Sequence, residues 1–230
     1  GGDGAFTSFS VLQEAPAEHP TLRSHRVAVG FYDLVDGALV RVHREELDVV
    51  GAKTEVPALV GRPQPDLVLV NDDDLTFAKI RLDERSLATV VGHVGAFTDS
   101  LPRALCWAAA WDMTRDAEMP ARDYLALVLA GIDRETDIGV VQSLLRQAQS
   151  ALALFADPAW APTGKALLAE RAHAALLAAA PGSDLQLAWT RALGSLARTP
   201  SQVALLRDLL SGAASVDGLG ASGDVGQVRG

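Results

Sequence analysis

The feature that most constrains the fold is an abrupt change of composition near residue 82. Residues 1–82 contain 12 valines and 8 alanines, whereas residues 83–211 contain 7 valines and 28 alanines. Valine, branched at Cβ, favours strands, and alanine favours helices because it loses no side-chain entropy there. We therefore predict an α+β chain of more than one domain, with a β domain over residues 1–82 and a helical domain over residues 83–211.

The first part carries the period-two pattern of strands. Apolar side chains recur at every second position in residues 27–31, and Val40 and Val42 alternate with Arg41 and His43. This period predicts that one face of each strand packs on a core and the other meets water. Asp36-Gly37, between the two runs, predicts a tight hairpin turn. Further strands are expected over residues 6–12, 53–60, 67–70 and 77–82. Together they predict a small antiparallel β-sandwich.

The second part is typical of a series of helices joined by short connections. Helices are expected over residues 84–94, 100–115, 120–132, 137–155, 163–180, 184–197 and 200–210. Their start signals are Asp83, Ser100, Pro120, Asp137, Asp184 and Thr199. Short connections join antiparallel neighbours, so we expect a solenoid-like array, in which the alanines of residues 174–180 let helices approach closely. The apolar period ends near residue 212, and residues 212–230 are predicted to be a disordered tail.

Charge and cysteine content exclude several classes of partner. The chain has 29 acidic and 20 basic residues, so we expect no nucleic-acid and no membrane partner. The sequence has no apolar run long enough for a membrane-spanning helix and no signal-peptide pattern. The lone Cys106 leaves no pair for a disulfide and fits a reducing compartment, for which we expect the cytoplasm. Because the chain begins at Gly1 rather than Met, we expect it to start inside a longer protein.

Two sets of residues could bind a metal ion. Asp72-Asp73-Asp74 could hold a hard cation, but the acidic spacing of a calcium loop is absent. We favour a turn in which these side chains bond their own backbone and face water. The histidines, at positions 19, 25, 43, 93 and 173, include no pair four residues apart, as a zinc site on one helix requires. We interpret them as surface residues or as core residues with satisfied hydrogen bonds.

Three features of the helical part have a structural and a functional interpretation. Cys106 lies in an apolar helix with no assignable partner His, so we predict a buried, inert thiol rather than a nucleophile. Trp107 and Trp111 could form an aromatic platform for a ligand, but core packing is favoured. The charged residues 113–124 are interpreted as a solvated connection between helices rather than a recognition loop. No residue is assigned as catalytic, metal-binding or cofactor-binding.

Three segments resemble the aminopeptidase N family, including its actinobacterial members. Residues 67–87, LVLVNDDDLTFAKIRLDERSL, are similar to the end of its β-sandwich domain and the first helix of its C-terminal domain. Residues 103–125, RALCWAAAWDMTRDAEMPARDYL, are similar to the next helical hairpin, and residues 6–29 to the entry strands of the sandwich. The likeness covers about residues 6–211. It implies the β-sandwich and the first part of the helical C-terminal domain, with an incomplete helical array.

The resemblance also implies a function for the intact protein. Family members are zinc metallopeptidases that remove single N-terminal residues from peptides. They bind zinc through H-E-x-x-H and a downstream Glu, and the amino end of the substrate through G-x-M-E-N. Neither motif occurs in this sequence. The resemblance therefore implies that zinc and catalysis belong to other parts of the intact enzyme, called the parent here, and no site residue is carried over.

Two functions remain as alternatives from the sequence. The resemblance implies a non-catalytic C-terminal portion, which supports and encloses the active site of an upstream catalytic domain that binds the peptide substrate. The alternative is a free-standing helical array that binds a peptide or protein partner on its concave surface.

Overall fold

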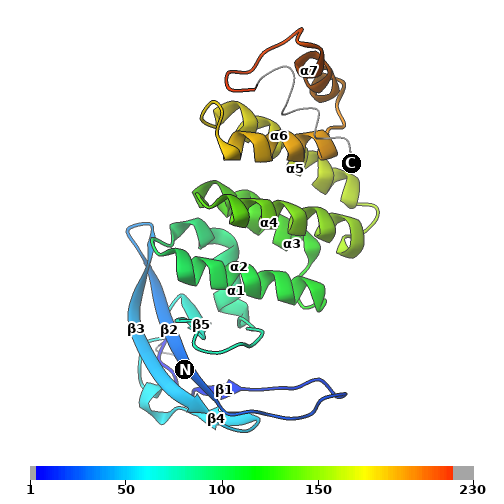
Figure 1. Ribbon diagram of the computed structural model, residues 1–230. Coiled ribbons are helices and arrows are strands. Elements are labelled where there is room, and N and C mark those ends of the chain that lie inside the picture. The colour runs from blue at the N-terminus through cyan, green and yellow to red at the C-terminus, as the bar shows by residue number, and fades with distance from the viewer. Residues whose placement is uncertain (1–3, 220–230) are drawn as a thin grey trace. The chain divides into compact units, whose positions relative to one another are not determined.

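The computed structural model describes residues 4–219 of the chain (Figure 1). Two compact units divide it, Gly1–Met113 and Thr114–Gly230. The described strands all lie in the first unit, together with the first helices, and the later helices lie in the second. Antiparallel strands followed by helices confirm the predicted α+β fold class.

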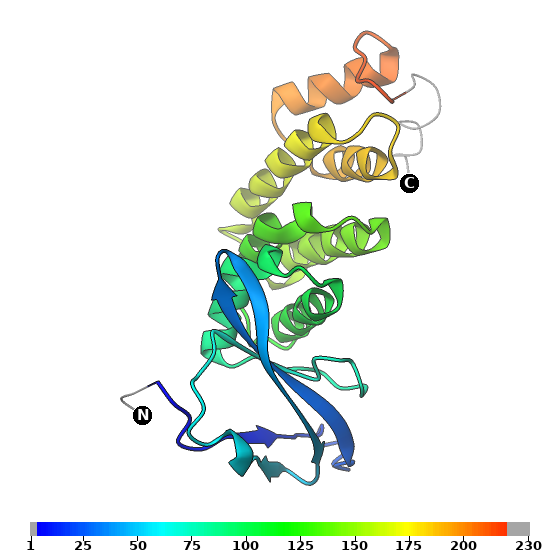
Figure 2. The same ribbon diagram turned by 90° about the vertical axis from the view of Figure 1, so that its left-hand side faces the viewer.

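The first unit contains two small antiparallel sheets. Their strands are β1 (Ser10–Leu12), β2 (His25–Val35), β3 (Ala38–Val49), β4 (Lys53–Glu55) and β5 (Leu67–Val70). The order of the larger sheet is β3-β2-β5, and β1 pairs with β4 in the smaller sheet. Asp36 and Gly37 join β2 to β3 with positive φ angles of 50° and 82°, which confirms the predicted tight turn. Figure 2 shows the strong twist of this hairpin.

A shared apolar cluster joins the two sheets. Val27, Val29 and Phe31 of β2 are buried in it together with Val11 of β1. The ring of Phe9 packs beside that of Phe31, with 5.8 Å between the ring centroids. This cluster is the sandwich core that the alternation of residues 27–31 predicts.

Both faces of β2 are buried, so the prediction of a solvated face is wrong for this strand. Residues 27–32 are all buried, because β2 is the central strand and is covered on both sides. One face meets the apolar cluster. On the other face the ring of Tyr32 packs edge-on against Phe97, with 5.3 Å between centroids.

The prediction that Val40 and Val42 face the core is also wrong. These side chains are 44% and 52% exposed. The register shifts at Val42, since Phe31 pairs with His43 while its neighbour Tyr32 pairs with Arg41. Such a β-bulge interrupts the alternation of faces. It places the ring of His43 beside that of Phe31, with 5.4 Å between centroids.

Three of the predicted strand segments are shorter than expected or absent. The range 6–12 forms a strand only over residues 10–12, and the range 53–60 only over residues 53–55. The second strand ends early because Pro57 has no N–H to donate to a neighbouring strand, and Pro57–Leu59 forms a 3₁₀ turn instead. The strand expected over 77–82 does not form. This segment buries Ile80 and Leu82, but none of the described strands pairs with it.

Seven helices follow the strands within the described residues, and they confirm the seven that the sequence predicts. They are α1 (Glu84–His93), α2 (Ser100–Arg115), α3 (Ala121–Gly131), α4 (Ile138–Ser150), α5 (Ala161–Ala178), α6 (Asp184–Leu196) and α7 (Pro200–Ser211). Asp83, Asp137 and Thr199 each accept a hydrogen bond from the backbone N–H three residues further on, as N-caps do. The cap of α6 is Ser183, one residue before the expected Asp184.

The helices of the second unit pack as a layered array. α5 lies along α6, α3 packs against α4 and α5, and α4 packs against α6. Helices two apart in the chain are therefore neighbours, as expected for a solenoid-like array. In Figure 1 the α3–α4 pair and the α5–α6 pair are stacked on one another.

A π-helical turn, Ala151–Phe155, ends α4. Its wider spacing is visible in the hydrogen bond from the N–H of Ala156 to the carbonyl of Ala151, 2.9 Å long. The turn buries Leu152 but leaves Phe155, which the helical period places on the buried face, 43% exposed. Gly164 of α5 faces Leu152 of this turn, and a Cβ built on Gly164 would lie 2.4 Å from Cδ2 of Leu152. The absent side chain lets α5 approach the turn.

The first residues of the predicted tail contact α6. Gly212 ends α7 in the left-handed conformation, with φ of 74°. The side-chain amide of Gln186 then donates to the carbonyl of Asp217 at 2.8 Å. Asp217 thus has a defined partner on α6, while the N–H of Ala214 donates to the carbonyl of Asp208 on α7. Residues 220–230, the rest of the predicted tail, lie outside the described residues.

Removal of the Thr199 cap should destabilise α7. The Thr199 hydroxyl accepts from the N–H of Gln202, and the Gln202 side chain accepts from the N–H of Thr199, both at 3.2 Å. Thr199→Ala should lower the free energy of unfolding by about 1 kcal/mol in urea titrations. Thr163→Ala, at an exposed position in the first turn of α5, is the control and should change it by less than about 0.5 kcal/mol. Equal losses in both variants would contradict the role of the cap.

Candidate functional site

A cavity of about 400 Å³ lies among the helices of the second unit. Residues 174–179, at the end of α5, supply four alanines to its wall. Because an alanine side chain ends at Cβ, these four positions leave unfilled space between α5 and the residues of α4 and α6 that line the cavity. Val141 of α4, with Leu185 and Trp189 of α6, forms the opposite apolar wall.

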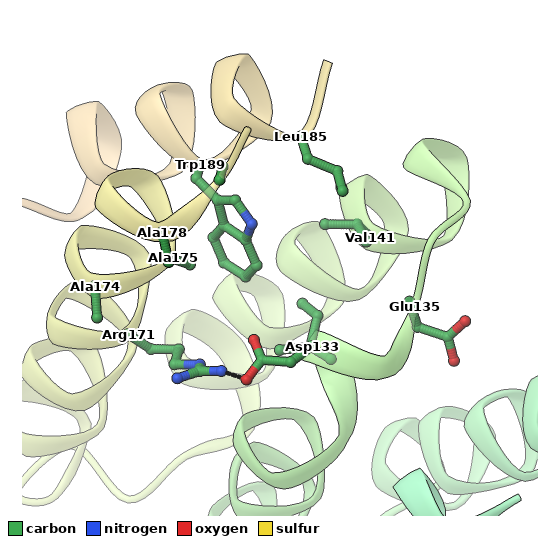
Figure 3. A pocket seen from close by; sticks show the side chains of 11 residues that line it. Asp133, Glu135, Val141, Arg171, Ala174, Ala175, Ala178, Leu185 and Trp189 are labelled. Carbon is green, nitrogen blue, oxygen red and sulfur yellow. Dashed lines mark ion pairs between the residues drawn. The ribbon is translucent and has the colours of Figure 1, made fainter. Parts of the chain in front are cut away.

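Three charged side chains also line the cavity: Asp133, Glu135 and Arg171. Arg171 of α5 forms an ion pair with Asp133, which lies in a 3₁₀ turn after α3 (Ile132–Arg134). The Arg171 Nε–H is buried and has no hydrogen-bond partner. A buried donor without a partner costs about 1–3 kcal/mol. The Arg171 side chain as a whole is 30% exposed. Figure 3 shows the indole of Trp189 reaching toward the Asp133–Arg171 pair.

The turn predicted at Asp72-Asp73-Asp74 forms, but the prediction that all its carboxylates face water is wrong for Asp72. Asp72 is 1% exposed. It accepts hydrogen bonds from the hydroxyl of Tyr32 at 2.6 Å and from Nη1 of Arg41 at 2.8 Å. Asn71, with a positive φ of 62°, turns the chain immediately after β5 and directs Asp72 back onto the sheet.

The hydrogen bonds of the cluster bind it to β2 and β3. Asp73 accepts from Arg41 at 3.0 Å and from Nε of Arg44 at 2.6 Å. Burial, and next the bond to Asp72, raise the pKa of the Tyr32 hydroxyl, and the bond to Asp72 raises the pKa of Arg41. The carboxylates are therefore used inside the protein as anchors for the hairpin.

Close approach of Asp72 to β2 requires a glycine at position 30. A Cβ built on Gly30 would lie 2.3 Å from Oδ2 of Asp72 and 2.8 Å from Cε2 of Tyr32. Any side chain would therefore displace both members of the buried hydrogen bond.

Cys106 and the two tryptophans of α2 lie where core packing places them. Cys106 is fully buried, which confirms the predicted burial, and that burial raises the pKa of its thiol. Trp107 is buried, and Trp111 is half-buried. Core packing is confirmed for Trp107.

The histidines occupy separate places. His25 Nδ1 lies 2.6 Å from the hydroxyl of Thr76, and His43 packs on Phe31. His19 and His93 are exposed, and His173 is half-buried. Surface or satisfied core positions were predicted, and these placements confirm them.

The charged residues 113–124 span the end of α2, a turn and the start of α3, as predicted for a connection between helices. Arg122 lies over the ring of Trp160, with its Cζ 4.8 Å from the ring centroid. This cation–π contact ties the start of α3 to the residue before α5.

Residues 4–219 show neither a metal-ligand cluster nor a membrane-spanning helix. In that part of the chain no three side chains of His, Cys, Asp or Glu lie together as metal ligands would. None of its helices has the length and apolarity to cross a bilayer.

The cavity was not predicted from the sequence, and the comparisons now give its context. Residues 67–223 match the family described as the ERAP1-like C-terminal domain. The chain belongs to this family. It is also 57% identical, over 94% of its length, to an Aminopeptidase N of Streptomyces lividans. The match covers 26% of that relative, so the chain spans about a quarter of its length.

These comparisons confirm the resemblance to aminopeptidase N on which the sequence interpretation depended. The chain corresponds to the C-terminal part of the relative, and the ERAP1-like C-terminal domain begins at β5, ahead of α1. The helical array and its cavity therefore lie within the matched domain.

Substitution of Gly30 tests the anchoring of Asp72. Gly30→Ala should lower the free energy of unfolding by about 1–3 kcal/mol, because the new methyl group overlaps the Asp72 carboxylate. Gly92→Ala in α1 is the matched control: its Cβ would meet nothing within 4 Å. It should leave stability unchanged or raise it by up to about 1 kcal/mol, since alanine is the better helix former. A Gly30→Ala variant as stable as the control would refute the close approach.

Asp66 supplies a pH-dependent contact within the first unit. Its carboxylate accepts from the N–H of Leu34 and from Nη2 of Arg85, each at 3.0 Å. The backbone bond from Leu34, followed by the bond from Arg85, lowers the pKa of Asp66 despite partial burial. A carboxyl group with a lowered folded-state pKa contributes stability at higher pH, and that contribution is lost as the pH falls through the folded pKa.

Asp66→Asn should therefore reduce the loss of stability in acid. Urea unfolding at neutral pH and below about pH 4 should show a smaller difference for Asp66→Asn than for the unaltered chain. Asp36→Asn, in the exposed hairpin turn, should keep the acid dependence of the unaltered chain. The assignment fails if the two variants respond to acid in the same way.

Proposed function

We propose that the chain is the non-catalytic C-terminal portion of an aminopeptidase N, in which the sandwich and helical array support and enclose a peptide-binding active site. The observation that carries this proposal is the identity of 57% across nearly the whole chain to a quarter of an Aminopeptidase N. Such a level of identity supports a shared role for the matched part. It favours this function over a free-standing module that binds a peptide or protein.

The catalytic metal in this proposal belongs to the parent. The family resemblance implies a zinc ion held by an H-E-x-x-H motif and a further Glu, and this sequence contains no such motif. Its histidines lie on separate elements, at positions 25 and 43 on β2 and β3, and at 93 and 173 on α1 and α5. An upstream catalytic domain is accordingly the main partner, and peptides are the substrate of the assembled enzyme.

The layered helices suit an enclosing role. In the second unit α3 to α6 pack on successive neighbours, which makes an extended wall from short helices. A wall of this kind selects peptides by size and shape, while bond cleavage takes place on other residues. We further propose that the parent acts in the reducing cytoplasm, where a single buried thiol such as Cys106 stays reduced.

Assays of the purified chain test this function. The chain should bind no stoichiometric zinc, as measured by metal analysis after dialysis against zinc. It should also release no chromophore from an alanyl p-nitroanilide substrate. Turnover that a chelator abolishes would show that the chain carries its own catalytic centre and would overturn the proposal. The sequence of the surrounding gene is the second test, since an upstream H-E-x-x-H motif is expected.

A further inference from the structure

The cavity of the second unit offers a positive group to a ligand. Arg171 pairs with Asp133 through Nη2, and 30% of its side chain is exposed. A carboxylate is the group that fits a guanidinium best, because its two oxygens accept parallel hydrogen bonds from the planar fork. A carboxylate in the cavity would therefore meet the exposed part of this guanidinium.

A negative group lies beside it. The Asp133 side chain is 52% exposed and that of Arg171 is 30% exposed, so the ion pair is accessible from solvent. Figure 3 shows the two side chains side by side at one end of the cavity. A ligand with one charge of each sign would meet both partners without a net change of charge.

The remainder of the cavity is apolar. Val141, Leu185 and Trp189 face the alanines of α5 across it. A volume of about 400 Å³ is near the lower end of the usual range for small-molecule pockets, and it suits one small molecule rather than a folded segment. The apolar walls give a hydrocarbon side chain a place out of water.

We propose that this cavity binds a free amino acid with an apolar side chain, its carboxylate on Arg171, its ammonium group on Asp133 and its side chain against Trp189. This inference stands on the cavity itself and does not depend on the proposed function. An amino acid is also the product that an aminopeptidase releases, so the cavity would sense product if both proposals hold.

Calorimetric titration of the chain with four compounds tests the assignment. L-leucine should bind. L-leucinamide lacks the carboxylate, and 4-methylpentanoate lacks the ammonium group. Each should bind at least about tenfold more weakly, because each loses one of the two charge-assisted contacts with the protein. Glycine, which lacks the side chain, should also bind more weakly, because it leaves the apolar walls uncovered.

Variants of the chain give the complementary result. Arg171→Gln should weaken leucine binding at least about tenfold, whereas Arg146→Gln, at an exposed site on α4, should bind as the unaltered chain does. Circular dichroism must show both variants folded. If Arg171→Gln is unfolded, Asp133→Asn replaces it, with the same expected loss. Trp189→Phe should retain binding but lose any change of tryptophan fluorescence that leucine causes.

Several binding results would contradict the amino-acid site. Absence of leucine binding, or equal binding of leucine and leucinamide, would overturn the proposal. So would leucine binding that a folded Arg171→Gln variant leaves unchanged. Equal binding of 4-methylpentanoate would overturn the role of Asp133. None of these results bears on catalysis, so the proposed function is tested separately by its own assays.

Discussion

Asp72 holds the first unit together, because it joins the turn after β5 to the β2–β3 hairpin, which lies far earlier in the sequence. It accepts hydrogen bonds from Tyr32 on β2 and Arg41 on β3, while its own N–H donates to the carbonyl of Ala28. A buried carboxylate is tolerated only when its oxygens are satisfied in this way. The glycine at position 30 and the bulge at Val42 both serve this arrangement, one by making room and the other by aligning Arg41.

The second unit depends on the sizes of its side chains. Gly164 lets α5 approach the π-helical turn, while the alanines of residues 174–179 leave a cavity further along the same helix. Close packing and vacant space thus occur on one element, within a few turns of each other. A helix that approaches its neighbour at one end and leaves a lined space at the other is suited to hold a small molecule.

The sequence predicts the fold better than the site. Composition and caps such as Asp83 and Asp137 locate the helices, since caps act within a few residues. The bulge at Val42 and the burial of Asp72 depend on pairing between distant segments, so local periodicity misses both. The same reason hides the cavity, where Asp133 and Arg171 meet from separate helices. Arg171 and the alanines after it share one face of α5, but that spacing is also typical of ordinary helix packing.

The arrangement around Asp72 also bears on the order of folding. Tyr32 and Arg41 lie close in sequence and come together when the β2–β3 hairpin closes, which is a local event. Asp72 arrives later along the chain, and its charge can be buried only after both of its hydrogen-bond donors are in position. During synthesis from the N-terminus, both strands of the hairpin are therefore complete before Asp72, whose carboxylate binds them, is made. Asp72 precedes α1 in the chain, so its hydrogen bonds to Tyr32 and Arg41 can fix the sheet before the helices are synthesised.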